Sequence, residues 1–276
     1  MDLSNAAVLK QFLARHGLSA SKGLGQHFLV SSKVVESIVA AASMCKGVLE
    51  IGPGPGVLTS RISENVEKMI ALELDESMIY ALTESAPKVD VRKSDALESN
   101  LTAILKELPE PRAVVSNLPY YITGPLITRI AEAKAEYVKA ILMMQKEVAD
   151  RVIAKPKTSA RGSLSVYLQL QFEIRLVVNA PAGAFLPPPK VDSAVLEFTP
   201  LASQPENEAF LFKLIRFGFA QPRKTLSNNL VAGYKIDRAA ALEWIAAAGL
   251  KELARPQELT NEEWLHLAAK APKLQP

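Results

Sequence analysis

Short apolar runs alternate with segments of helical periodicity along the chain as far as Pro200. Apolar runs of about four to eight residues indicate strands buried on both faces, and apolar spacings of three and four indicate amphipathic helices. The predicted strands are residues 47–51, 68–73, 89–92, 112–116, 137–144, 173–178 and 191–198. This alternation predicts an α/β, Rossmann-like sheet, mostly parallel, with helices on both faces and one antiparallel strand at an edge.

The pattern changes after Pro200. Residues 201–208 form a polar linker, and beyond it the spacing predicts helices and no strand. The predicted helices are residues 209–219, 224–230, 237–248 and 261–270, together with 6–15 and 32–42 at the front of the chain. We therefore predict a sheet-containing domain over residues 1–200 and a small all-helical domain over residues 201–276.

Composition excludes several classes of protein. The chain has 276 residues, of which 49% are hydrophobic and 22% charged, as in ordinary globular domains. No apolar run approaches the ~20 residues that span a bilayer, and the first residues do not resemble a signal peptide. A single cysteine excludes an intramolecular disulfide and a cysteine-rich metal site. We expect a cytoplasmic protein without a membrane partner.

Charge distribution is more informative than the net charge of +3. Residues 3–35 and 209–236 contain lysine and arginine but no aspartate or glutamate, and residues 146–161 form a third basic stretch. Clustered positive charge favours binding to a polyanion such as a nucleic-acid backbone.

A glycine-rich turn follows the first predicted strand, in the segment from Glu50 to Gly56. Glycines such as Gly52 and Gly54 let the backbone approach a ligand without a Cβ clash, at the edge where open α/β sheets bind cofactors. Glu73 ends the next strand and can accept hydrogen bonds from ribose hydroxyls, while Asp95 can accept from an adenine amine. This pattern fits both a nicotinamide dinucleotide and S-adenosylmethionine.

The fourth strand favours S-adenosylmethionine. It ends in Asn117, Leu118, Pro119 and Tyr120. The Asn117 side-chain oxygen and the Leu118 carbonyl can accept the two N–H bonds of an exocyclic amine, and Pro119 stiffens the loop. Tyr120 offers a face for a flipped purine. A dehydrogenase has no evident use for this combination, whereas an amino-methylating enzyme has.

With these motifs in order, the sequence resembles the ribosomal RNA adenine N6-dimethyltransferase family, especially its bacterial members that act on small-subunit RNA. The resemblance extends from Lys22 to Leu230. Its carriers are Gly25-Gln26-His27-Phe28-Leu29, Glu50-Ile51-Gly52-Pro53-Gly54, Asn117-Leu118-Pro119-Tyr120-Tyr121, Gln145-Lys146-Glu147-Val148-Ala149, Phe185 with Pro187-Pro188-Pro189-Lys190-Val191-Asp192-Ser193, and Arg223-Lys224-Thr225-Leu226 with Asn228-Asn229-Leu230.

The resemblance assigns roles to individual positions. It implies S-adenosylmethionine as methyl donor, no metal, and a cofactor pocket formed by Gln26, His27, Leu29, Gly52, Gly54, Glu73, Asp95 and Asn117. It places the target base among Asn117, Leu118, Pro119 and Tyr120, with Phe185 as a second stacking wall. His27 stands where many relatives have asparagine, so the resemblance leaves open whether its side chain or only its backbone contacts the cofactor.

The resemblance also implies an RNA partner. We expect a monomer that dimethylates two adjacent adenosines in the 3′-terminal hairpin loop of 16S rRNA within an immature small subunit. The RNA-binding side chains would be Lys22, Lys146, Arg151, Lys190, Arg223 and Lys224, the last two in the RNA-contacting helical domain. Three alternatives stay open: a large-subunit rRNA adenine methyltransferase, a non-catalytic RNA-binding assembly factor of the same fold, and a nicotinamide oxidoreductase.

Overall fold

A computed structural model describes residues 1–19, 26–203 and 205–272. The chain forms two compact units, one of Met1–Ala149 with Ile174–Pro200 and one of Asp150–Glu173 with Leu201–Pro276. No helix in the described ranges combines the length and apolar character needed to cross a membrane.

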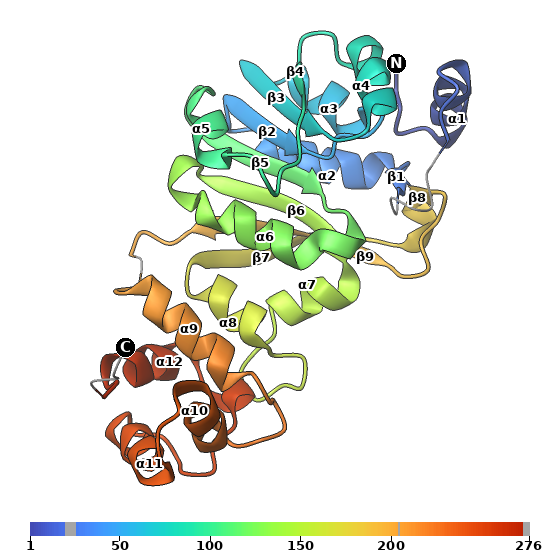
Figure 1. Ribbon diagram of the computed structural model, residues 1–276. Helices are drawn as coiled ribbons and strands as arrows, with labels where there is room; N and C mark the ends of the chain where they lie inside the picture. Colours follow the sequence, from blue (N-terminus) through green and yellow to red (C-terminus); the bar gives the residue numbers. More distant parts are fainter. Residues whose placement is uncertain (20–25, 204, 273–276) are drawn as a thin grey trace. The chain divides into compact units, whose positions relative to one another are not determined.

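A seven-stranded sheet forms the centre of the first unit (Figure 1). Its order is β4-β3-β2-β5-β6-β9-β7, where the first five run parallel and β9 is antiparallel to β6. The strands are β2 (Gly47–Ile51), β3 (Lys68–Glu73), β4 (Asp90–Lys93), β5 (Arg112–Asn117), β6 (Lys139–Gln145), β7 (Phe172–Ala180) and β9 (Ser193–Pro200). The predicted sheet is therefore confirmed. The antiparallel strand differs in place, because β9 lies one position inside the edge and β7 lies outside it.

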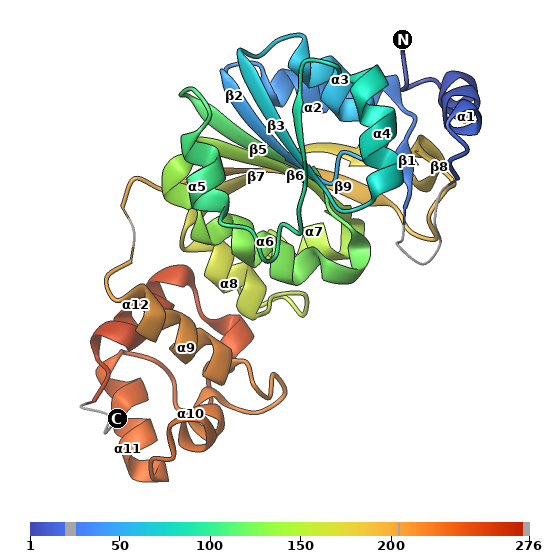
Figure 2. The same cartoon turned by 45° about the horizontal axis from the view of Figure 1, so that its top comes forward.

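Helices cover both faces of the sheet. Helices α2, α3 and α4 lie on one face, and α5 and α6 lie on the other (Figures 1 and 2). The helices of this unit are α1 (Ala6–Arg15), α2 (Ser32–Ala42), α3 (Val57–Ser63), α4 (Glu76–Ser85), α5 (Leu101–Lys106), α6 (Thr123–Glu132) and the start of α7 (Lys146–Val152). Asp75 caps α4, because its Oδ1 accepts from the Ser77 backbone N–H at 3.0 Å.

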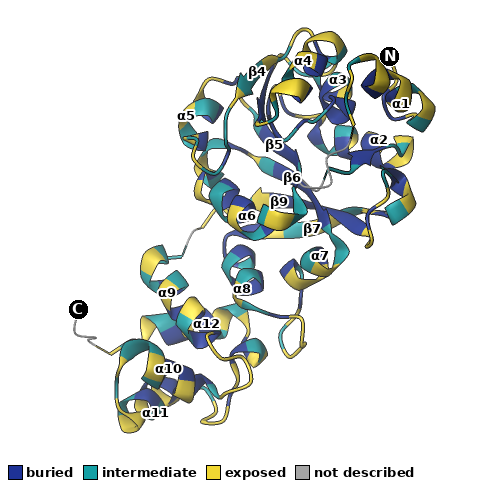
Figure 3. Cartoon of the chain, turned by 45° about the vertical axis from the view of Figure 1, so that its right-hand side comes forward, coloured by how far each residue is buried: buried dark blue, intermediate teal, exposed yellow. Residues whose placement is uncertain are grey.

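The core explains why most positions of the central strands are apolar. Every residue of β2 is buried, and the middle of β5 and of β6 is buried as well (Figure 3). Val48 and Val115 belong to the cluster of side chains that contains Val34 and Ile38 of α2. A strand covered on both faces favours apolar side chains at nearly every position, which accounts for the apolar runs; the buried Glu50 of β2 is the exception.

A second, two-stranded sheet was not predicted. It pairs β1 (Phe28–Leu29) antiparallel with β8 (Phe185–Leu186), so two segments far apart in sequence meet here. Strands of two residues carry no periodicity, so hydrophobic pattern alone cannot reveal them.

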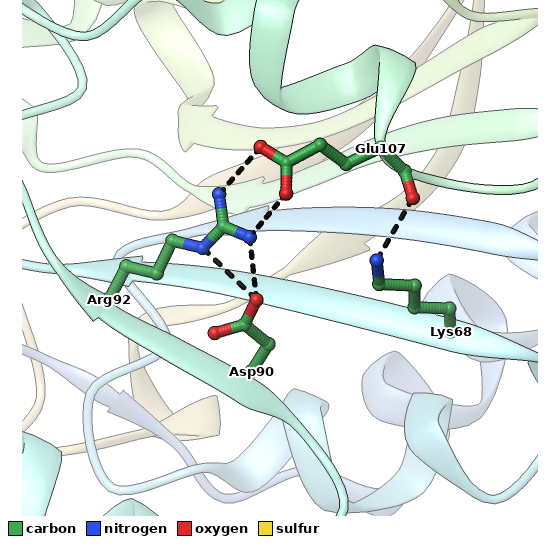
Figure 4. Close-up of polar contacts among 4 residues, drawn as sticks. All are labelled: Lys68, Asp90, Arg92 and Glu107. Carbon is green, nitrogen blue, oxygen red and sulfur yellow. Dashed lines mark hydrogen bonds and ion pairs between the residues drawn. The ribbon is translucent and has the colours of Figure 1, made fainter.

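A charged cluster lies at the edge of the sheet formed by β4 (Figure 4). The Arg92 guanidinium donates to both carboxylate oxygens of Glu107, at 2.9 and 2.6 Å, and also to Asp90. Lys68 donates to the Glu107 backbone oxygen at 3.0 Å. These contacts tie β4 to the segment that follows α5.

The second unit is helical. Its helices are α8 (Ser163–Gln169), α9 (Glu208–Gly218), α10 (Leu226–Tyr234), α11 (Arg238–Ala247) and α12 (Asn261–Ala269). They pack around Trp244 and Trp264, both almost fully buried, and the Trp244 indole N–H donates to the Leu267 carbonyl at 2.7 Å.

The division into units differs from the predicted boundary in one segment. Residues Asp150–Glu173 precede Pro200 in sequence but pack with the C-terminal helices. Val166 and Leu170 belong to the helical core, and the buried Arg161 donates to Asn261 Oδ1 at 2.6 Å. These partners lie about a hundred residues away, so local composition gave no sign of them.

Candidate active site

A cavity of about 650 Å³ opens at the carboxyl ends of the parallel strands. The segments that follow β2, β3, β4 and β5 line it together with the segment around β1, because the parallel register brings these strand ends to one edge. The predicted residues found in its wall are Gln26, His27, Leu29, Gly52, Gly54, Glu73, Asp95, Asn117, Leu118, Pro119 and Tyr120.

The turn after β2 requires glycine for its backbone conformation. Gly52 has φ +70° and Gly54 has φ +56°, in the left-handed region where a Cβ is strained. A Cβ built on Gly52 would meet no described atom within 4 Å, whereas one on Gly54 would lie 3.3 Å from the Phe28 ring. The turn therefore leaves open space beside Gly52 while it packs closely against β1.

Glu73 is held rigidly at the end of β3. Its Oε1 accepts from the backbone N–H groups of Leu74 and Asp75, at 2.8 and 3.0 Å, and its Oε2 accepts from Gly54 at 3.0 Å. A carboxylate has about four acceptor positions, so one on Oε2 stays available for a hydroxyl group.

Glu50 is a second carboxyl group in the cavity wall, 1% exposed. Burial raises its pKa to about 8, the Thr59 hydroxyl opposes this rise, and the negative charge of Glu73 adds to it. Glu50 is therefore largely protonated at neutral pH.

Two aspartates lie farther along the same wall. Burial acts to raise the pKa of Asp75, but hydrogen bonds from Ser77 and Gln26 outweigh it and leave the pKa lowered. The Gln26 amide reaches Asp75 Oδ2 at 3.3 Å and so joins the N-terminal segment to the turn after β3. Asp95 is half-buried, and its Oδ1 accepts from the Leu97 backbone N–H at 2.8 Å.

The end of β5 presents two acceptors. Asn117 Nδ2 donates to the His27 carbonyl at 3.3 Å, which directs the amide nitrogen to that partner. The Leu118 N–H donates to the Met143 carbonyl at 2.9 Å. Within the described ranges, Asn117 Oδ1 and the Leu118 carbonyl oxygen accept no hydrogen bond. Both atoms are free to accept the N–H bonds of an amine.

Tyr120 and His27 stack on each other. Their ring centroids lie 5.7 Å apart at an interplanar angle of 25°. His27 Nδ1 lies 2.8 Å from the Pro187 carbonyl, and because a carbonyl oxygen only accepts, Nδ1 carries the hydrogen. The His27 side chain is therefore engaged by Tyr120 and Pro187.

Phe185 differs from the prediction. Its side chain is 3% exposed in the main core, its backbone pairs with Leu29, and it is not among the described residues of the cavity wall. The short β1–β8 ladder pairs its backbone with Leu29, and its side chain belongs to the core cluster that also contains residues of α1 and α2. In this structure it does not form a second stacking wall.

The predicted RNA-binding side chains are spread over both units. Lys190, Arg151, Arg223 and Lys224 are exposed, whereas Lys146 is half-buried at the start of α7. The Lys146 N–H donates to the Asp192 carbonyl at 2.8 Å, which brings the start of α7 to the segment that carries Lys190. Lys22 lies outside the described residues.

Sequence reasoning assigned no role to several residues of the cavity. Leu74 and Tyr121 line it and are 55% and 62% exposed, unusual values for large apolar side chains. Leu74 directly follows Glu73. Its position, an apolar residue at the carboxyl end of a parallel strand, was the sequence signal that could have identified it as a cavity residue. No group of three or more potential metal-binding side chains occurs in the described part of the chain.

Comparison with known proteins identifies the family. The model of the family described as ribosomal RNA adenine dimethylase matches residues 17–272. The chain belongs to this family. It is therefore an rRNA adenine dimethylase, a methyltransferase that depends on S-adenosylmethionine.

Relatives with a small-subunit methyltransferase name align with most of this chain. "Ribosomal RNA small subunit methyltransferase A" of Streptococcus equi subsp. zooepidemicus (strain MGCS10565) is 38% identical over 283 residues, covering 97% of each chain. The protein of the same name from Geobacillus thermodenitrificans (strain NG80-2) is 39% identical over 241 residues, covering 83% of this chain and 82% of its own.

Two solved structures have the same fold over most of the chain. A dimethyladenosine transferase from Plasmodium falciparum has a TM-score of 0.70 and 26% identity, and covers 87% of this chain and 96% of its own. The 23S rRNA methyltransferase ErmE has a TM-score of 0.66 and 25% identity, with coverage of 88% and 98%.

The cavity suits the cofactor of this dimethylase family. The open space beside Gly52, the acceptor position on Glu73 and the carboxylate of Asp95 follow one another along the strand ends. Ile51, Leu74 and Ala96 add apolar surface to the same wall. A volume of about 650 Å³ falls within the range of cofactor sites, roughly 300–1,000 Å³.

Proposed function

We propose that the protein transfers methyl groups from S-adenosylmethionine to N6 of two adjacent adenosines in the 3′-terminal hairpin loop of 16S rRNA. The substrate would be an immature small subunit, the reaction cytoplasmic, and the protein a monomer. The observation that carries the proposal is the pair of unused acceptors at the end of β5, Asn117 Oδ1 and the Leu118 carbonyl oxygen, in the wall of the cofactor-sized cavity.

An adenine amine is a poor nucleophile, and two hydrogen-bond acceptors can make it a better one. Its N6 lone pair is conjugated with the ring and attacks poorly. Asn117 Oδ1 and the Leu118 carbonyl would each accept one N–H bond, which favours a pyramidal nitrogen with its lone pair directed at the methyl carbon. Tyr120 would stack on the purine, for about 1–3 kcal/mol. These residues contribute orientation and local electrostatics.

The remaining wall would hold the methyl donor. S-adenosylmethionine supplies a methyl group on a positively charged sulfur, which is already activated for displacement. Glu73 would accept from a ribose hydroxyl and Asp95 from the adenine amine, while the turn at Gly52 gives room for the methionine part. A C–N bond forms as the C–S bond breaks, and N6 then loses a proton to solvent.

The small subunit is favoured over the large one. Curated relatives that share 38% identity and cover 97% of the chain carry a small-subunit name, whereas ErmE, named for 23S rRNA, is 25% identical. Similarity of fold alone does not separate the two substrates, because both solved structures superimpose on most of the chain.

The proposal is tested by offering the protein purified small and large subunits from cells that lack these methylations, with methyl-labelled S-adenosylmethionine. We expect label only in the small subunit, on two adjacent adenosines that primer extension locates. Label only in the large subunit would favour the macrolide-resistance type of enzyme. Binding to small subunits without any transfer would favour a non-catalytic assembly factor.

A further inference from the structure

The Tyr120 side chain is held at its hydroxyl group as well as at one ring face. Tyr120 Oη lies 2.8 Å from Ser193 Oγ, and the His27 ring covers one face of the phenol ring. A tyrosine fixed at two points keeps its ring plane without relying on a bound ligand. The target purine would then stack on the face that His27 does not cover.

Ser193 reaches Tyr120 because of the direction of its strand. It is the first residue of β9 and pairs with Gln145, the last residue of β6. Since β9 runs antiparallel to β6, its beginning lies at the carboxyl end of the parallel strands, where the cavity opens. Ser193 is 0% exposed and Tyr120 is half-buried, so the hydrogen bond is partly shielded from water.

His27 completes the support. Its ring is fixed by the Pro187 carbonyl, and its own carbonyl accepts from Asn117 Nδ2. Tyr120 and Asn117 are therefore anchored to segments that meet beside the β1–β8 ladder. A shift of the Tyr120 ring would move a stacked purine, and with it the amine, away from the two acceptors at the end of β5.

We propose that Ser193 is a positioning residue for methyl transfer: its hydroxyl fixes Tyr120 between His27 and the target base, so that the amine meets Asn117 and Leu118. This inference rests on the proposed function. Ser193 itself is absent from the described wall of the cavity, so its effect passes through the Tyr120 hydroxyl.

A double-mutant cycle tests this role. We expect Ser193→Ala and Tyr120→Phe each to lower kcat/KM with undermethylated small subunits about fivefold, which corresponds to one hydrogen bond of about 1 kcal/mol. The loss should fall on kcat, because phosphate contacts elsewhere set RNA affinity. The double variant should be no slower than the slower single variant, because both changes remove the same bond.

Ser4→Ala is the matched control. Ser4 is a buried serine of the same unit, 5% exposed, whose hydroxyl also pairs with another hydroxyl, Ser32 Oγ, at 2.9 Å, but it does not line the cavity. It should keep its kcat while losing comparable thermal stability. Ser193→Thr, which retains the hydroxyl, should restore part of the lost rate.

Three outcomes would overturn the role of Ser193. They are losses that multiply in the double variant, a Ser193→Ala variant as fast as Ser4→Ala, and no gain in Ser193→Thr over Ser193→Ala. Each of these presupposes an active wild-type protein and leaves the proposed function standing. A wild-type protein that transfers no methyl group would overturn the proposed function and the role of Ser193 together.

Discussion

At the scale of single residues, the site depends on which polar atoms are already engaged. The Asn117 amide nitrogen is bonded to the His27 carbonyl, which leaves its oxygen for a ligand. Glu73 is bonded by three backbone N–H groups and keeps one acceptor position. Such partial engagement fixes each side chain before a substrate arrives, which is the condition for electrostatic preorganisation.

Asn117→Ala should abolish methyl transfer, with a loss of at least about 100-fold, because one of the two acceptors for the amine is removed. Cofactor affinity should change little, since Glu73, Asp95 and the glycine turn stay in place. Single-turnover transfer and calorimetric titration with S-adenosylmethionine measure the two effects separately. Near-normal turnover would remove Asn117 from its proposed role.

Glu50→Gln should make the protein less sensitive to alkaline pH. The pKa of Glu50 is raised from 4.5 to about 8, so the folded protein retains a proton that the unfolded chain loses over this interval. Stability of the wild type therefore falls as pH rises from about 4.5 to 8, by on the order of a few kcal/mol at about 1.4 kcal/mol per pKa unit. Glutamine stays neutral throughout.

Thermal denaturation of the ligand-free protein measures this difference. The Tm of Glu50→Gln should match that of the wild type below pH 4.5 and exceed it at pH 8. Glu64→Gln, an exposed glutamate with the same change of charge, serves as control. A Tm difference that is constant across this range would contradict the assignment.

At the scale of elements, the two ends of the parallel strands carry different features, the cavity at one end and stabilising ion pairs at the other. Their carboxyl ends carry the cavity, and their amino ends carry the ion-pair cluster around Arg92 (Figure 4). The short β1–β8 ladder has a different task, because it fixes the segments that hold His27 and Pro187 against the end of β5.

Arg92→Met should lower Tm by about 1–3 °C without changing cofactor affinity, because it releases β4 from the segment after α5. The hydrogen bond from Arg92 lowers the pKa of Glu107 below its ordinary 4.5. The ion pair therefore stabilises the protein at neutral pH, and the Tm difference should shrink as pH falls below 4.5.

Arg238→Met provides the comparison, because Arg238 is exposed and its ion pair with Glu252 is long, at 3.9 Å. Its Tm should stay close to that of the wild type. An equal loss in both variants would show that the geometry of the Arg92 cluster adds nothing.

At the scale of the whole molecule, a net charge of only +3 conceals stretches without acidic residues. Exposed basic side chains occur in both units, Lys190 in the first and Arg223 with Lys224 in the second. RNA held by several such side chains would bind with strong dependence on salt, while the cavity selects the base.

Arg223→Ala combined with Lys224→Ala should weaken binding to small subunits and reduce the slope of log K against log salt concentration by about 1.5. Transfer should recover at saturating subunit concentration, because the cavity is unchanged. Filter binding at several salt concentrations is the measurement. Lys46→Ala with Lys88→Ala removes the same charge from exposed positions and should leave the slope unchanged. Equal slopes in both double variants would contradict the proposed contact.

The main elements, and the edge of the sheet that carries the site, follow from the amino-acid sequence alone. Buried strands such as β2 and β3 require apolar runs, and the glycine turn, Glu73, Asp95 and Asn117 lie next to those runs. Since parallel strands share one carboxyl edge, their neighbours in sequence become neighbours in space.

Contacts between segments far apart in sequence became visible only in the folded chain. The fold buries Phe185 through the β1–β8 ladder, joins residues 150–173 to the C-terminal helices, and places Ser193 at the Tyr120 hydroxyl. Each arrangement depends on partners some seventy to a hundred and sixty residues apart, where no local period or propensity applies. The raised pKa of Glu50 has the same origin, because it arises from burial that the whole fold produces.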